Sequence, residues 1–583
     1  MSSNLTDRHT GYPSIDKPWL KYYSEEAINA SLPECTIYEC LYENNKDYPS
    51  DIAINYLGRK ITYGELFENI DKTAAAFLKA GVKAKEIVTV ALPSVPEVLY
   101  CVYALNKIGA VANMIHPLAG KDETLFYFNE VQSRIAVIFD GAYETIANEI
   151  EKSSVEKVIV VSPADSMSFA LRIAYKLKVK TPQLDGKVFQ SWRSFIEDGK
   201  GTHIKTVNKD CRDIAIISHT GGTTGDPKGC MLSDYNYNAE VSQIVTTIHY
   251  ERQESFLAVL PPFVNYSLVH SMIGAVNSGL ISVLLPRYEP LKLVKYIQKY
   301  HIDHINSIPA YCEALLQIKN IEKHQFPNFG YLFYGGEAMQ EEIENQINAI
   351  MQKCCFKHKL QKGLGMTELT GAATKTLDEV NEIGSVGIPL PKMVCKIIST
   401  ESGEELQYGQ EGEVCIAGPT LMLGYYKNED ETKKIIKKHK DGKIWIHTGD
   451  LGYIDENGEL FITGRIKRLI VTKGKDQQAT KLFPDRIEKV LAMHQAVELC
   501  CVIGVPDSER IHYPKAFIVV KEKTNTERIK KELLEICEQN LPEYMIPDEI
   551  EFVDDMPRTP RGKIDYRALE NTQKKYLTGG ERQ

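Results

Sequence analysis

The stretch over residues 216–230 most constrains what this chain of 583 residues can fold into. It reads IISHTGGTTGDPKGC and begins within an apolar run, residues 214–217, which predicts a buried strand. Glycines in the following loop allow backbone conformations closed to other residues and bring main-chain N–H groups close to an anion. Threonine hydroxyls add donors, and Lys228 adds positive charge. The stretch therefore predicts a strand that ends in a polyphosphate-binding loop.

An ordinary glycine-rich surface turn is the alternative interpretation of this loop. A Walker A loop is excluded, because Lys228 is followed by glycine rather than by serine or threonine. The pattern resembles the phosphate loop of the adenylate-forming superfamily: acyl-CoA synthetases, adenylation domains of peptide synthetases, and luciferases. That family usually has serine at the position of Gly221. The resemblance implies that ATP is bound by Thr220, Gly221, Gly222, Thr223, Thr224, Gly225 and Lys228.

Length and composition bound the class of protein. The chain is too long for one hydrophobic core, and its 43% hydrophobic and 25% charged residues are typical of a soluble globular protein. A net charge of −9 gives no indication of a nucleic-acid partner. The 13 cysteines show no CxxC spacing and no Cys/His cluster that suggests a metal. We therefore expect mostly buried thiols in a reducing, cytoplasmic compartment.

Strand and helix patterns alternate through the first 140 or so residues, which predicts a parallel sheet with helices on both faces. Thr62 and Glu65 have the spacing of a capping box, and Gly81 predicts the end of the helix that they begin. The fold class predicted is α/β. The resemblance implies a large N-terminal domain (residues 1–464) of parallel and mixed sheets with flanking helices and a β-barrel-like part. A small, mobile α+β domain (residues 465–583) is expected to follow it.

Two segments raise the question of a membrane. Residues 256–286 contain no Asp, Glu, Lys or Arg and could span a bilayer by length. Prolines and polar residues interrupt them, so a strand, a buried helix and a second strand are the better prediction, without stable membrane insertion. Residues 166–180 predict a basic amphipathic helix, for which a solvated surface position is favoured over a membrane or partner site. The N-terminus lacks the apolar region of a secretory signal.

Further motifs of the same family follow in order. YLFYGGE ends at Glu337 and GLGMTE ends at Glu368. The resemblance implies that Thr367 donates to the α-phosphate and that Glu368 holds Mg²⁺, for which one carboxylate beside phosphate oxygens is enough. Leu364 replaces the tyrosine that the family usually stacks on adenine. The residues expected at the adenine are Gly336, Glu337, Ala338, Gly363, Leu364 and Gly365.

Asp450 lies in TGDLGY, after a predicted strand and before a hairpin turn at Asn457-Gly458. A carboxylate there can accept both ribose hydroxyls, and Arg465, in TGR, can add a donor. The alternative is that Asp450 only forms a turn and that Arg465 is a surface residue. The resemblance favours the ribose role.

The C-terminal segment contains two further residues with family roles. Lys467 matches the hinge about which the small domain rotates. Lys563, in PRTPRGKIDYRAL, matches the catalytic lysine; a basic surface residue is the alternative. After Gly474 the chain is roughly five residues longer than the family pattern. In the family this loop lies near the place where the thioester-forming step assembles. The sequence therefore supports the adenylation step more strongly than the identity of the thiol acceptor.

The acid pocket is expected near Asn265, Tyr266 and His270, because LAVLPPFVNYSLVHSM resembles the family segment that lines it. Asn265-Tyr266 is similar to the variant of aryl-acid-activating members. Core packing with one capped asparagine is the alternative. A small aryl or hydroxy-aryl acid is indicated, and a fatty acid is not excluded.

Together these motifs predict a two-step ligase that uses ATP, Mg²⁺ and coenzyme A. A carboxylate attacks the α-phosphorus, pyrophosphate leaves, and a thiol then takes the acyl group. Lys563 acts as a charge clamp in the first step. Three alternatives remain: an enzyme that loads an acyl-carrier protein in trans, a catalytically silent nucleotide-binding relative, and a light-emitting oxidase.

Overall fold

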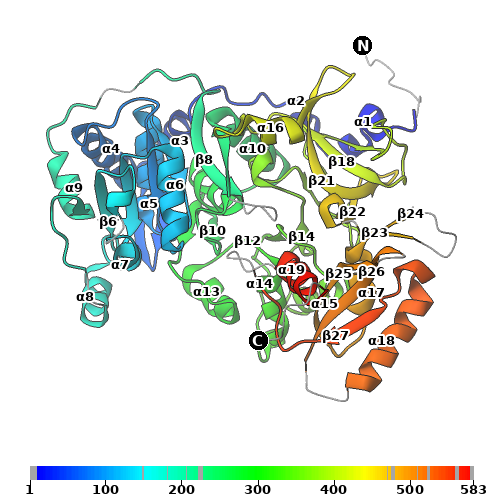
Figure 1. Ribbon diagram of the computed structural model, residues 1–583. Coiled ribbons are helices and arrows are strands. Elements are labelled where there is room, and N and C mark those ends of the chain that lie inside the picture. The colour runs from blue at the N-terminus through cyan, green and yellow to red at the C-terminus, as the bar shows by residue number, and fades with distance from the viewer. Residues whose placement is uncertain are drawn as a thin grey trace, which may run out of the picture.

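The computed structural model contains three larger sheets followed by a smaller α+β unit (Figure 1). In Figure 1 the mostly blue and cyan strands of the first sheet lie at the left and the yellow strands of the third sheet at the upper right, with the green strands between them, and the orange and red C-terminal elements lie below the yellow strands. The predicted α/β fold class is confirmed. The structure describes residues 10–147, 150–179, 182–204, 207–220, 227–468, 470–473, 479–507, 510–521, 526–558 and 564–577.

The phosphate-loop stretch lies in an eight-stranded sheet of order β19-β9-β8-β4-β3-β5-β6-β7. Ile216 stands opposite Ala112 of the parallel strand β4 and opposite Leu232 of the antiparallel strand β9. All three side chains are buried, so the predicted buried strand is confirmed. The strands are β3 (Ile87–Ala91), β4 (Val111–Met114), β5 (Ile135–Phe139), β6 (Lys157–Val161), β7 (Phe189–Ser191), β8 (Ile214–Thr220), β9 (Lys228–Ser233) and β19 (Gly424–Tyr425).

Local hydrogen bonds begin the first long helix of this region as predicted. The Thr62 hydroxyl accepts from the Glu65 N–H at 3.2 Å, and the Glu65 carboxylate accepts from the Thr62 N–H at 2.9 Å. This capping box starts α4 (Tyr63–Lys79), and Gly81 follows its end with φ +84°. Helix α4 packs against α5 (Pro96–Lys107), which buries nearly all of its residues between α4 and the sheet.

The second sheet has seven strands in the order β14-β13-β12-β10-β11-β1-β2. The uncharged segment 256–286 forms β10 (Ser255–Ala258), a buried helical stretch at 265–277 and β11 (Ile281–Leu284), as predicted. None of the helices in the described parts of the chain is long and apolar enough to cross a membrane. The remaining strands are β1 (Ile52–Tyr56), β2 (Arg59–Thr62), β12 (His304–Ser307), β13 (Leu332–Tyr334) and β14 (Gln361–Lys362).

The third sheet is antiparallel and has five strands, and the β-barrel-like part stays a prediction. Strand β21 pairs with β18, β20 and β22, and β18 also pairs with β17. Gly458, with φ +90°, lies in the turn between β21 and β22, where Asn457-Gly458 predicts it. The strands are β17 (Val394–Ile398), β18 (Gly412–Ala417), β20 (Ile436–Lys438), β21 (Ile444–Ile454) and β22 (Leu460–Arg465).

The C-terminal unit has its own core around Ile487, Ile518 and Leu533. Its three-stranded sheet and its helices match the predicted α+β pattern. The boundary after residue 464 stays a prediction. The elements are β23 (Ile470–Lys473), β24 (Ala479–Leu482), α17 (Pro484–Leu491), β25 (Val497–Asp507), β26 (Ile511–Val520), α18 (Thr526–Asn540), β27 (Glu549–Phe552) and α19 (Tyr566–Leu577).

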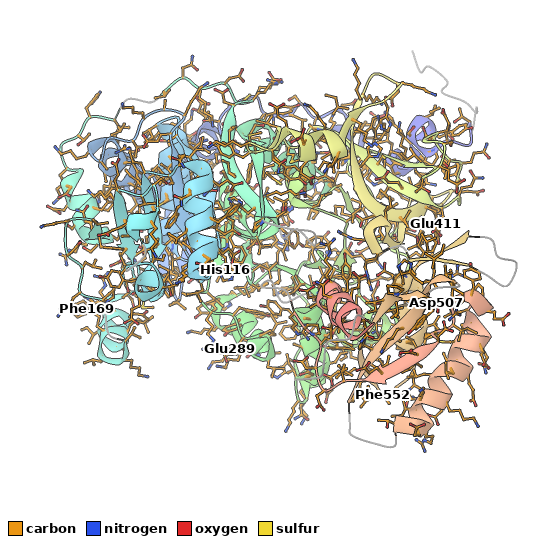
Figure 2. All side chains as sticks on the ribbon, viewed as in Figure 1. His116, Phe169, Glu289, Glu411, Asp507 and Phe552 are labelled. Carbon is orange, nitrogen blue, oxygen red and sulfur yellow. The ribbon has the colours of Figure 1, made fainter. Side chains whose placement is uncertain are left out.

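The basic amphipathic helix forms as α8 (Phe169–Lys178) and buries none of its residues. Phe169 and Leu177 are 78% and 83% exposed. Figure 2 shows Phe169 at the edge of the molecule. The helix therefore lies on the surface of the protein, and the choice of solvent over a membrane or a partner stays a prediction.

Candidate active site

The two strands on either side of the phosphate loop, β8 and β9, pair in an antiparallel hairpin. Thr220 ends β8 and stands opposite Lys228, the first residue of β9. Gly229 follows, where a Cβ would lie only 2.8 Å from Cγ2 of Ile217, so the close approach of the two strands requires glycine. The other predicted loop residues lie outside the described residues: Gly221, Gly222, Thr223, Thr224 and Gly225.

The ammonium group of Lys228 already has a carboxylate partner. It forms an ion pair with Glu431 of α16 (Glu429–Ile435) and lies 5.2 Å from the ring centroid of Tyr425. Hydrogen bonds from Lys228 and Lys434 lower the pKa of Glu431 to about 2. Glu431 is therefore ionised throughout the physiological range and holds Lys228 at the base of the loop.

Tyr425 connects this lysine to the predicted magnesium ligand. Its hydroxyl donates to Oε1 of Glu368 at 2.6 Å, and both side chains are buried. Burial and the neighbouring Glu368 raise the pKa of the Tyr425 hydroxyl, which therefore remains a donor. A buried carboxylate oriented by a hydroxyl beside the phosphate loop is a hard oxygen ligand that fits Mg²⁺.

The turn that carries Thr367 and Glu368, η8 (Thr367–Leu369), is followed by a residue in the left-handed region. Thr370 has φ +66°, which costs free energy for a β-branched residue. Two contacts hold it: its hydroxyl donates to the carbonyl of Thr420 at 2.7 Å, and its carbonyl accepts from the side-chain amide of Asn265. The strained residue thus fixes where the Thr367–Glu368 turn lies.

Asn265 links this turn to the phosphate-loop strand. Its Oδ1 accepts from the Ser218 hydroxyl of β8 at 2.9 Å and from the Tyr237 hydroxyl of α10 (Asp234–Thr247). Since its Nδ2 bonds Thr370, both ends of the buried amide contact protein atoms. Through these contacts Asn265 positions the turn before Thr370 against strand β8. Its predicted place in the acid pocket stays a prediction.

The two glycine-rich turns expected at the adenine leave adjacent parallel strands of the second sheet. Tyr334 of β13 pairs with Lys362 of β14, so the turns after both strands lie at the same sheet edge. Gly336 has φ +85°. Gly336, Glu337 and Ala338, in the turn after β13, are all exposed.

Close backbone approach explains the glycines of GLGMTE. A Cβ on Gly363 would lie 2.3 Å from the carbonyl oxygen of Thr374, and one on Gly365 would lie 2.2 Å from that of Gly371. Leu364 lies between them, half-buried against the core of the third sheet. The main chain of this turn is therefore fixed by protein contacts before any ligand binds.

Asp450 and Arg465, the two residues expected at the ribose, lie next to each other; their role at the ribose stays a prediction. They pair across β21 and β22, with Nε of Arg465 2.8 Å from Oδ1 of Asp450. Burial raises the pKa of Asp450, while Arg465 and the Thr448 hydroxyl act in the opposite direction. The Arg465 side chain is 57% exposed, so the pair presents an acceptor and a donor at one edge of the third sheet.

Tyr266 and His270 lie one helical turn apart, with ring centroids 5.3 Å apart. His270 Nε2 lies 3.1 Å from Oε1 of the buried Glu240, which also accepts from the Ala372 N–H at 2.7 Å. A Cβ on Gly335 would lie 3.9 Å from the Tyr266 ring. Tyr266 thus adjoins the turn after β13, and His270 is linked through Glu240 to Ala372. The contact of either ring with an acid substrate stays a prediction.

Two family models match this chain. The model described as AMP-binding enzyme covers residues 41–426, and the AMP-binding enzyme C-terminal domain covers residues 486–563. The chain belongs to the AMP-binding enzyme family. The predicted membership of the adenylate-forming superfamily is confirmed.

Curated relatives match this AMP-binding enzyme over nearly its whole length. A probable 4-coumarate–CoA ligase 1 of Dictyostelium discoideum is 30% identical, over 94% of this chain and 97% of the relative. A long-chain-fatty-acid–CoA ligase of Bacillus subtilis is 28% identical, over 95% and 97%. The fold is similar to that of o-succinylbenzoate coenzyme A synthetase of Bacillus subtilis, in complex with ATP and magnesium ion, with a TM-score of 0.73, 21% identity and coverage of 93% and 100%.

Two residues with predicted roles, Lys467 and Lys563, belong to the junction with the C-terminal unit and to its last segment. The backbone of Lys467 lies in the short helix η9 (Ile466–Arg468) between the third sheet and the C-terminal unit. Next to it, the Arg465 N–H donates to Asp485 of α17 at 3.2 Å, which joins the two parts. Lys563 lies outside the described residues.

Three residues of the site had no role in the sequence-based prediction. Tyr425 stands in the GYY that ends a recognised family segment, but nothing local indicates that its hydroxyl reaches Glu368. Glu431 lies in a charged helix without a motif, and Thr370 directly follows the recognised TE pair. Only position in the ordered series of motifs could have drawn attention to Tyr425 and Thr370.

Proposed function

We propose that this enzyme activates a small carboxylic acid with ATP and transfers it to coenzyme A, with the residue roles given below. It is an AMP-forming acid–thiol ligase that uses ATP, Mg²⁺ and coenzyme A. The observation that carries the residue roles is the chain of contacts from Lys228 past Tyr425 to Glu368. It brings a cation, a hydroxyl and a carboxylate to the base of one phosphate loop.

In the first step a carboxylate oxygen of the acid attacks the α-phosphorus in line and pyrophosphate leaves. Lys228 and the hydroxyls of Thr220 and Thr367 orient the phosphates, because fixed donors at developing negative charge lower the barrier. Glu368 would hold Mg²⁺, which supplies positive charge to the phosphate oxygens. Asp450 and Arg465 hold the ribose. In the second step the thiol sulfur attacks the acyl carbon and AMP leaves.

Lys563 is proposed as the charge clamp of the first step and Lys467 as the hinge that later withdraws it, with the domain boundary at residue 464. Lys563→Ala is expected to reduce adenylation by about 10²-fold or more. Thioester formation from supplied acyl-adenylate is expected to stay within about threefold of wild type. Arg567→Ala, a nearby loss of positive charge, is the control. Equal losses in the two half-reactions would contradict this division.

Two observations support a proposal for the class of acid that the enzyme activates. Asn265, Tyr266 and His270 lie in a segment similar to that of aryl-acid-activating members, and the relatives are named for coumarate and long-chain fatty acids. We propose an aryl acid first and a fatty acid second. Both reactions would take place in the cytoplasm, where ATP and coenzyme A are supplied.

The test is pyrophosphate release with aryl, medium-chain, long-chain and amino acids, each with and without coenzyme A. Turnover that requires coenzyme A with one acid class supports the proposal and names the substrate. One stoichiometric burst that coenzyme A does not extend would favour an acyl-carrier protein in trans. No release with any acid, together with ATP binding, would favour a silent nucleotide-binding relative.

A further inference from the structure

One cysteine and two histidines gather on a face of the third sheet. Cys415 comes from β18, His447 from β21, and His439 directly follows β20. Their ligand atoms, one sulfur and one nitrogen from each ring, all lie within 4.8 Å of one another. The two Nε2 atoms are 3.0 Å apart. No motif in the sequence joins these residues.

Strand register builds the cluster. Cys415 and His447 are directly opposite in the β18–β21 ladder, so their side chains share a face of the sheet. His439 begins the turn between β20 and β21, where its N–H donates to the carbonyl of Lys443 at 3.0 Å. The His439 ring also stacks on Trp445 at 5.8 Å between centroids. Paired strands and a stacked indole thus hold all three side chains.

A carboxylate orients one of the imidazoles. Nδ1 of His447 lies 2.8 Å from Oε2 of Glu413, two residues before Cys415 on β18. When Nδ1 carries the proton and donates it to Glu413, the lone pair of Nε2 points at His439 and Cys415. A carboxylate that binds the remote nitrogen of a histidine is the usual support of a metal-binding imidazole.

The two imidazole nitrogens, 3.0 Å apart, lie near the spacing of a tetrahedral zinc centre, and the Cys415 sulfur lies within 4.8 Å of both. Zn–N bonds of about 2.0 Å and Zn–S bonds of about 2.3 Å place two nitrogens roughly 3.3 Å apart and nitrogen and sulfur roughly 3.5 Å apart. Small side-chain rotations would bring the three donors to these distances. Cys415 is fully buried, whereas His439 is partly exposed and offers an entry path and a fourth position for water.

The charges around the cluster nearly balance. Lys396, opposite Cys415 in register, would oppose a cation, but it lies 3.5 Å from Asp441 and 4.0 Å from the Trp445 ring centroid. Glu413 adds a second carboxylate. A deprotonated Cys415 would supply the charge that a dication needs. The ordinary alternative is a neutral imidazole pair joined by one hydrogen bond.

We propose that Cys415, His439 and His447 bind one Zn²⁺, with Glu413 as a positioning residue. Sulfur and nitrogen donors without a carboxylate select zinc over Mg²⁺ or Ca²⁺. This site is distinct from the Mg²⁺ position proposed at Glu368. The bound ion would join β18, β21 and the β20–β21 turn. Its ligand His447 lies three residues before Asp450 on β21.

The test is a metal titration of the full-length enzyme after treatment with a chelator. Wild type is expected to bind one equivalent of Zn²⁺ in competition with a chromophoric chelator. Co²⁺ in its place is expected to give a sulfur-to-cobalt charge-transfer band. Cys415→Ser is expected to abolish that band and to weaken Zn²⁺ at least 100-fold. Cys395→Ser is the matched control, because Cys395 is an equally buried thiol on the adjacent strand β17, out of register with His447.

Two further variants keep the result decisive if Cys415→Ser does not fold. His439 is partly exposed, and His439→Gln is expected to weaken Zn²⁺ at least 100-fold while the circular dichroism spectrum is unchanged. Glu413→Gln is expected to weaken it about 10- to 100-fold. Zinc should raise the melting temperature of wild type and not that of His439→Gln. Absence of stoichiometric binding to wild type, or equal binding by wild type and His439→Gln, would overturn the proposal.

Discussion

Strand β21 carries two polar clusters, and they differ in how they arise. Near its end, Asp450 meets Arg465 in a hairpin whose residues stand close together in the sequence. Three residues earlier, His447 meets His439, which precedes it by only 8 residues across the β20–β21 turn, and also Cys415, which comes from the distant strand β18. The first cluster could be predicted from a motif. The second depends on strand register, which no single stretch of sequence specifies.

Two regions of the molecule also differ in the kind of metal ion that their ligand atoms favour. The Glu368 region offers a carboxylate and hydroxyls, whereas the Cys415 cluster offers sulfur and nitrogen. Hard and soft ligand sets of this kind prefer different ions. The two regions should therefore respond independently to substitution.

The largest effect is expected from Glu368→Gln. The variant keeps the shape of the side chain and the Tyr425 contact but removes the charge that would hold Mg²⁺. We expect pyrophosphate release to fall by about 10²- to 10³-fold. The measurement is steady-state pyrophosphate release across a Mg²⁺ titration. The control is Glu342→Gln, on the exposed face of α15 (Glu341–Lys353). Glu344 on the same helix is not a suitable control, because it forms an ion pair with the buried Lys362.

Asp450→Asn is expected to raise the KM for ATP by about 10- to 100-fold, since an amide cannot accept from both ribose hydroxyls. The same variant should discriminate less between ATP and 2′-deoxy-ATP. Zinc binding at Cys415 should be unchanged. If Asp450→Asn also lost zinc, or if His439→Gln lowered pyrophosphate release by more than about twofold, the two clusters of β21 would be one coupled site.

This residue also predicts a pH dependence. Burial raises the pKa of Asp450, so protonation begins at a higher pH than for an ordinary aspartate. The protonated form cannot accept both hydroxyls. The KM for ATP should therefore rise as the pH falls toward the acidic range, and the preference over 2′-deoxy-ATP should shrink with it. A preference independent of pH would contradict the ribose role.

Tyr425→Phe removes the hydroxyl that donates to Glu368. Hydrogen bonds to charged groups contribute about 1.5–3 kcal/mol, so we expect a loss of roughly 10- to 100-fold in kcat/KM for ATP, toward the lower end. The requirement for Mg²⁺ should move to higher concentration. Tyr453→Phe, on β21 of the third sheet, is the control. A change in kcat/KM below twofold would show that Tyr425 does not orient Glu368.

The smallest effect is expected from Glu431→Gln. Glu431 competes with phosphate for Lys228, so its removal should lower the KM for ATP about two- to fivefold, less at high salt. Because pairing lowers the pKa of Glu431 to about 2, the carboxylate is charged in every ordinary assay. The difference between variant and wild type should thus be constant between pH 6 and 9. A KM that rises instead would mean that Glu431 orients Lys228 for ATP.

Much of the molecule followed from short stretches of sequence. The capping box of Thr62 and Glu65, the turn at Gly458 and the buried strand before Thr220 are determined by hydrogen bonds or side-chain periodicity within a few residues. The hairpin turn at Asn457-Gly458 was predicted, and the structure shows that this hairpin pairs Asp450 with Arg465. The order of the motifs determined the family, because each motif supports the interpretation of the next.

Tertiary structure alone decided the contacts between distant segments. Tyr425 reaches Glu368 across 57 positions, and Asn265 reaches Thr370 across 105. Cys415 stands opposite His447 only because β18 and β21 pair in one register. Such contacts depend on which strands become neighbours and how they are aligned, and that choice is made by packing of the whole core rather than by any local pattern.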